Sequence, residues 1–151
     1  MAGVIVENLL NIEEKIDRMS ELRSRRDAID KDIKKLSEPM VSDRGLIPII
    51  YEWFKEILSE RDCPPNPDSP HQRKKFLFIV LSLYNPGFFM GDKMQYGLRR
   101  DLANCLGVGA ESVISDNCSN LLFIYRHYRE FSGDAEYVLL KIKERLFLCD
   151  K

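Results

Sequence analysis

The sequence has few of the residues from which metal centres, disulfide frameworks and acid–base sites are built. Its 151 residues include only four cysteines and two histidines. The cysteines lie far apart and form no Cys-x-x-Cys or Cys/His ligand pair, so neither a zinc site nor a disulfide framework is predicted. His71 and His127 belong to no recognisable catalytic arrangement, and the chain has no glycine-rich phosphate-binding motif. We therefore expect a protein that is not an enzyme and that has no cofactor and no metal.

Long hydrophobic runs and an excess of charge are also absent. The longest apolar run, Phe76 to Leu81, is far shorter than the ~20 residues of a membrane-spanning helix, so no membrane partner is expected. Lys and Arg number 23 against 24 Asp and Glu, a net charge of −1, so attraction to nucleic acid can come only from local charge. Residues 1–5 show no cationic region before an apolar segment, as a secretory signal would. We expect a cytoplasmic protein.

Proline and glycine are missing from residues 4–36, where apolar residues recur every three or four positions. The series comprises Ile5, Leu9, Ile12, Ile16 and Met19 and, after a three-residue step, Leu22, Ile29, Ile33 and Leu36. A narrow apolar stripe among balanced charges, here with Arg26 on the stripe, is typical of a coiled coil. We predict a coiled-coil helix over residues 1–37 that pairs with itself as a homodimer. A single helix packed on the chain's own globular part is the alternative.

The rest of the chain is predicted to be a linker, residues 38–46, and a compact helical domain, residues 47–151. Pro39 ends the first helix, and four prolines between residues 63 and 70 exclude a helix there. Residues 73–84 are predicted to form a helix, although a buried strand also fits their composition. Residues 88–90 form either a short wing or a loop inserted into the core, and residues 132–134 separate the last two helices. The fold class is all-α.

Two residues within 98–108 (LRRDLANCLGV) suit a pair of short crossing helices. Ala103 provides a small side chain where the second helix would cross the first, and Gly107 provides a glycine where the chain would turn. This segment resembles the first half of the helix-turn-helix of bacterial and phage regulators and of region four of sigma factors. The resemblance implies a helix-turn-helix-like unit over residues 98–120, with a recognition helix from Ser112 to Asn120. One extra turn residue, compared with the family pattern, would place Ile114 and Cys118 on its buried side.

The resemblance also implies two sets of DNA contacts. Phosphate contacts are expected from six basic residues between positions 70 and 100, a stretch with one acidic residue: Arg73, Lys74, Lys75, Lys93, Arg99 and Arg100. Base contacts are expected from Ser112, Ser115, Asn117 and Asn120, since an amide can pair with adenine. The expected recognition helix has no Lys or Arg, and Glu111 and Asp116 are acidic, which also fits a unit that contacts protein.

Two functions follow from these observations. The first is a non-enzymatic DNA-binding protein, a dimeric transcription regulator of phage or mobile-element type. Its coiled coil would place two reading helices on double-stranded DNA. The second is a protein-interaction adaptor, or a small structural subunit of a larger assembly, held to a protein partner through the coiled coil.

Overall fold

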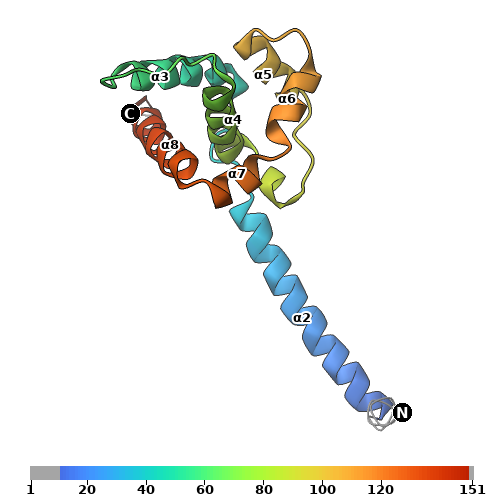
Figure 1. The fold of residues 1–151 in the computed structure, drawn as a ribbon. Helices are drawn as coiled ribbons and strands as arrows, with labels where there is room; N and C mark the ends of the chain where they lie inside the picture. Colours follow the sequence, from blue (N-terminus) through green and yellow to red (C-terminus); the bar gives the residue numbers. More distant parts are fainter. Residues whose placement is uncertain (1–10, 150–151) are drawn as a thin grey trace. The chain divides into compact units, whose positions relative to one another are not determined.

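The computed structural model describes residues 11–149, and these residues form helices and connecting segments without a strand (Figure 1). The predicted all-α fold class is confirmed. The chain divides after Ser37 into two units, residues 1–37 and residues 38–151. Among the helices of residues 11–149, none combines the length and the apolar character needed to cross a membrane.

The first unit contains one long helix, α2 (Ile12–Leu36), whose two ends are both well capped. The side chain of Asn11 accepts a hydrogen bond from the Glu14 amide at 2.7 Å. Acidic residues lie in the first turn and basic residues in the last turn, as the helix dipole favours. No residue of α2 is buried, and its large apolar side chains are between 47% and 82% exposed. Ile5 and Leu9 of the predicted coiled coil lie outside the described residues.

The second unit is built around α4 (Pro70–Tyr84), which begins at the N-cap Ser69. The continuous apolar run of α4 forms a helix, as predicted, because α3 (Ile47–Ser59), α6 (Glu111–Cys118) and α8 (Arg129–Cys149) pack around it. Ten of its fifteen residues are buried. At one contact, the Phe76 ring lies 4.7 Å from the Tyr51 ring and 5.5 Å from the Phe54 ring, centroid to centroid. A helix surrounded by helices needs no polar face.

Residues 38–46, predicted as a linker, are held to this unit by hydrogen bonds. The amides of Met40 and Val41 donate to the Leu83 carbonyl at 2.9 and 3.1 Å. A short 3-10 helix, η1 (Arg44–Leu46), then leads into α3. After α4, a second 3-10 helix, η2 (Pro86–Met90), packs Phe88 and Phe89 against the core. Of the two predictions for residues 88–90, this arrangement matches a loop inserted into the core rather than a short wing.

The predicted boundary at residues 132–134 is wrong. Helix α7 (Leu121–His127) ends before Tyr128, which has an extended backbone, and α8 runs straight through Gly133. Phe131, Ala135 and Val138 form one buried helix face across that glycine. Burial of this face outweighs the roughly 1 kcal/mol that an internal glycine costs a helix.

Candidate nucleic-acid interface

Helix α5 (Leu98–Leu106) and α6 are joined by four residues and pack against each other. Gly107 adopts a left-handed conformation with φ +69°, and the Val108 amide donates to the Ala103 carbonyl at 3.0 Å. Ile114 and Cys118 are buried, as predicted for this side of α6. Two short helices around a glycine turn are compatible with a helix-turn-helix, and the relationship to that family stays a prediction.

Three of the six predicted phosphate-binding residues lie at or before the start of α5. Arg99 and Arg100 are exposed in its first turn, and Lys93 is exposed in the preceding loop. The two arginines border a hollow of about 330 Å³ together with Tyr96 and with Glu111, the first residue of α6. Neither arginine forms an ion pair with any residue between 11 and 149. The starts of the two helices therefore meet at one surface that carries two arginines without ion pairs and one carboxylate, that of Glu111.

The other three basic residues lie on α4 and do not share this surface. The Lys75 side chain is 6% exposed and donates to Oδ2 of Asp134 at 2.6 Å, so it has a structural role and is not free to bind phosphate. Arg73 is half-buried. Lys74 borders a different hollow, next to His71. The predicted basic set is therefore divided between two places in the fold.

The predicted base-contacting residues are divided in a similar way. Ser112 is exposed in the first turn of α6, and Ser115 is half-buried on the next turn. The side chain of Asn117 donates through Nδ2 to the Val113 carbonyl of its own helix at 2.7 Å. This bond engages the side-chain amide that is predicted to read a base. Asn120 lies beyond the end of α6, at the start of α7. Of the four predicted base-contacting residues, Ser112 and Ser115 are the two that lie on α6 with no side-chain hydrogen bond among the described residues.

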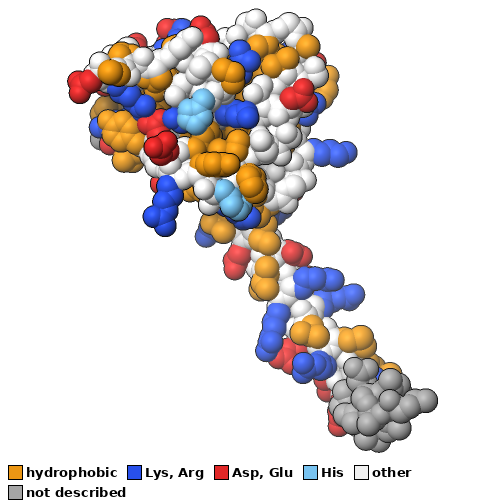
Figure 2. Space-filling model, in the orientation of Figure 1, with side chains coloured by type: hydrophobic (Ala, Val, Ile, Leu, Met, Phe, Trp, Pro, Cys, Tyr) orange, Lys and Arg blue, Asp and Glu red, His pale blue; other side chains and the backbone are white. Residues whose placement is uncertain are grey.

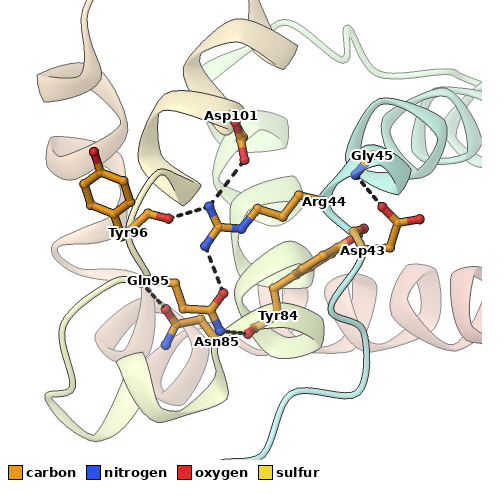
Figure 3. Close-up of polar contacts among 8 residues, drawn as sticks. All are labelled: Asp43, Arg44, Gly45, Tyr84, Asn85, Gln95, Tyr96 and Asp101. Atoms are coloured by element: carbon orange, nitrogen blue, oxygen red, sulfur yellow. Dashed lines mark hydrogen bonds and ion pairs between the residues drawn. The ribbon is translucent and has the colours of Figure 1, made fainter.

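Arg44, which the sequence did not single out, connects residues 43–46 to the loop before α5 (Figure 3). Its Nη1 donates to the Tyr96 carbonyl at 2.5 Å and lies 3.4 Å from Oδ2 of Asp101, and its Nη2 donates to Gln95 Oε1 at 3.2 Å. Gly97, which follows Tyr96, has φ +79°, and a Cβ at this position would lie 3.0 Å from Nη1 of Arg44. The guanidinium thus positions the backbone that leads into α5.

The same network contains two further residues from the end of α4. The side chain of Gln95 donates through Nε2 to the Tyr84 carbonyl at 2.5 Å. The backbone N–H of Gln95 donates to Asn85 Oδ1 at 2.7 Å. The Tyr84 hydroxyl donates to the Asp43 carbonyl at 2.7 Å, and burial raises its pKa, so it stays a donor at any ordinary pH. No single sequence pattern could show these contacts, because their members are spread over residues 43–101.

The network also affects the charge of the surface. Asp101 is in the first turn of α5, beside Arg99 and Arg100, but its carboxylate is turned to Arg44. The positive charge of Arg44 therefore offsets the negative charge of Asp101, so that Glu111 is the one carboxylate among the residues that line the hollow with the two arginines. This arrangement can attract an anionic chain such as a phosphate backbone.

In the part of the chain that the structure describes, no cluster of three or more His, Cys, Asp or Glu side chains is arranged to hold a metal ion. Compared with known proteins, the chain matches no family model, no curated sequence and no solved structure. The assignment of a function therefore depends on the geometry of the chain itself.

Proposed function

We propose that the protein binds double-stranded DNA through the start of α5 and the first turns of α6, as a cytoplasmic homodimeric regulator of phage or mobile-element type. The observation that carries this proposal is the exposed pair Arg99 and Arg100. Both are free of ion pairs among the described residues and lie beside the start of α6, while Arg44 holds the neighbouring carboxylate of Asp101. Contacts of this kind position a helix-turn-helix on the phosphate backbone.

In this proposal phosphate contacts provide most of the affinity and α6 provides a smaller sequence preference. Lys93, Arg99 and Arg100 contact phosphates, whereas Ser112 and Ser115 face base edges. Lys75 and Asn117 are left out because their polar groups already have partners inside the protein. A short reading helix without Lys or Arg supports modest specificity from one copy of the chain, which a second copy would increase.

The second copy is supported by α2. Seven large apolar side chains along this helix are exposed: Ile12, Ile16, Met19, Leu22, Ile29, Ile33 and Leu36. Pairing of two such helices would gain about 25 cal/mol of free energy for each Å² of apolar surface that it buries. A homodimer through α2 places two copies of α6 on related half-sites.

The test of DNA binding is the salt dependence of duplex affinity, measured by fluorescence anisotropy. Neutralising Arg99→Gln and Arg100→Gln removes four positive charges from a dimer, so the slope of log K against log salt should become shallower by about four. The control variant, Lys31→Gln with Lys141→Gln, loses the same charge from α2 and α8 and should keep the wild-type slope. Equal slopes for the two variants would contradict the proposed interface.

Sequence preference is tested separately by selection from a pool of random duplexes. Ser112→Ala should change which bases are selected while leaving affinity for unselected duplex unchanged, because a serine at a base edge contributes specificity rather than phosphate attraction. A selected sequence identical to that of the wild type would place base reading elsewhere.

A protein-interaction adaptor is the second candidate, and the exposed stripe of α2 is the observation that favours it. Light scattering on the full chain distinguishes the two candidates. Ile16→Glu puts a charge on the stripe and should convert a homodimer to a monomer, whereas Ser24→Glu, on the opposite side of α2, should not. A wild-type monomer that binds no duplex would support the adaptor and exclude the dimeric regulator.

A further inference from the structure

A hollow of about 710 Å³ lies between the start of α4, helix α7 and the start of α8. Its apolar lining includes Phe123, Ile124 and Phe131. Figure 2 shows histidine side chains on the face that it presents, with hydrophobic side chains exposed between them. Phe123 remains 55% exposed although it lines the hollow, so residues 11–149 do not cover this apolar surface. Small-molecule sites in proteins are typically of this size and are mainly apolar.

Positive and neutral nitrogen donors surround this apolar lining. Lys74 and Arg129 both line the hollow, and neither side chain has an ion pair or hydrogen bond with any of residues 11–149. His71 also lines it and has no hydrogen-bond partner among those residues. Glu130 is the one acidic residue of the lining. The balance of charge around the hollow is therefore positive.

The two histidine rings are held in place by aromatic contacts. His71 meets the Phe131 ring edge-on, at 5.8 Å between centroids. His127 stacks on Phe123 at 4.0 Å, and its Nδ1 lies 2.8 Å from the Phe123 carbonyl. This bond leaves Nε2 of His127 available to a ligand. The imidazoles thus supply fixed polar groups at the edge of an aromatic surface.

The pKa of His71 responds to burial and to the charges near its ring. Burial and the charges of Lys75 and Lys74 lower the pKa of His71, while those of Asp134 and Glu130 raise it by less, so the net pKa is lowered. A bound anion would oppose the effect of the lysines, since a negative charge stabilises the imidazolium. The pKa of His71 can therefore report whether the hollow is occupied by an anion.

We propose that this hollow, which we call the aromatic pocket, binds an amphipathic organic anion, a flat aromatic body bearing a carboxylate, sulfonate or phosphate. The aromatic body packs against Phe123 and Ile124, and the acidic group is held by Lys74 and Arg129. The pocket is separate from the proposed DNA surface, so the proposal does not rest on DNA binding.

The probe for this test is 8-anilino-1-naphthalenesulfonate, a fluorescent aromatic sulfonate, titrated into the full chain. We expect one saturable site per chain, with unchanged far-UV circular dichroism, because the ligand enters a folded pocket rather than a loosened core. Lys74→Gln with Arg129→Gln should weaken binding by about tenfold or more, as the loss of charge-assisted hydrogen bonds implies. Lys31→Gln with Lys141→Gln, a charge-matched control outside the pocket, should leave the affinity unchanged.

A neutral analogue separates the apolar contribution from the ionic one. N-phenyl-1-naphthylamine has the same ring system without the sulfonate, and its affinity should be equal for the wild type and for Lys74→Gln with Arg129→Gln. In a parallel NMR titration, saturation with the sulfonate should raise the pKa of His71 and leave that of exposed groups on α2 unchanged. Failure of the sulfonate to bind, or equal weakening by both double variants, would overturn the proposal.

Discussion

Replacing Asp134 by alanine removes the carboxylate through which α8 holds two cations of other segments. Lys75 of α4 donates to it at 2.6 Å, and Arg61, which follows α3, forms a hydrogen-bonded ion pair with it. The Lys75 side chain is 6% exposed, whereas those of Asp134 and Arg61 are 19% and 30% exposed. In the variant, the ammonium of Lys75 stays in the protein interior without its anion.

The expected loss of unfolding free energy is about 3 kcal/mol. Breaking a buried ion pair from one side costs about 3–5 kcal/mol, and the partial exposure of Asp134 and Arg61 places this pair at the low end. Urea unfolding followed by circular dichroism and by the fluorescence of Trp53 measures it. Lys75→Met in the Asp134→Ala background removes the stranded charge as well, and about 2 kcal/mol should be recovered.

Glu144→Ala is the matched control, since its carboxylate lies 3.8 Å from Lys141 on the exposed side of α8. This variant should unfold at the same urea concentration as the wild type. A loss of under about 1 kcal/mol for Asp134→Ala, the range of a surface pair, would refute the argument. So would a double variant less stable than Asp134→Ala alone.

The same carboxylate makes stability sensitive to acid. Burial by itself raises the pKa of Asp134, but the hydrogen bonds and charges of Arg61 and Lys75 outweigh it, and the net pKa is lowered. Because the folded pKa is below the unfolded value of about 3.9, Asp134 stabilises the fold above that pH, and the contribution is lost as the pH falls through the folded pKa. The stability difference between wild type and Asp134→Ala should therefore shrink in this acid range, and a constant difference would contradict the linkage.

Three further outcomes are expected. Gly97→Ala places a Cβ at φ +79° and 3.0 Å from Nη1 of Arg44, so it should cost about 1–2 kcal/mol in urea unfolding, and an unchanged midpoint would contradict the strain. Tyr84→Phe removes a hydrogen bond of 2.7 Å to the Asp43 carbonyl and should cost about 1 kcal/mol of unfolding free energy, and an unchanged midpoint would contradict this contribution. Cys63 is exposed, whereas burial raises the pKa of the Cys118 thiol to about 12. A disulfide reagent near pH 8 should therefore label Cys63 rapidly and Cys118 slowly. Similar labelling rates for the two thiols would show that α6 opens readily.

The helices could be predicted from the sequence where proline, glycine and apolar spacing agree. Pro39 and the prolines of residues 63–70 delimit α2 and α4, and Gly107 with Ile114 and Cys118 gives the register of α6. The boundary at Gly133 failed because a local helix-breaking signal competed with burial of a whole helix face. That burial depends on neighbouring helices, which local signals do not describe.

The candidate sites were harder to predict. Arg73, Lys74 and Lys75 are three consecutive basic residues that look alike in sequence, yet only Lys75 is buried, because of a carboxylate 59 residues later. Arg44 could not be recognised either, since its partners lie 51 to 57 residues away. Periodicity shows which helix face is apolar, but it does not show which cation meets which anion.

The capping of α2 has a consequence for the order of events during synthesis. Its N-cap, its acidic first turn and its basic last turn lie within the same 26-residue stretch, and no residue of the second unit is needed to satisfy them. Since α2 precedes residues 38–149, it emerges from the ribosome while the second unit is still being synthesised. In the proposed homodimer, neighbouring nascent chains on one messenger would then be able to pair through α2 before either second unit is complete.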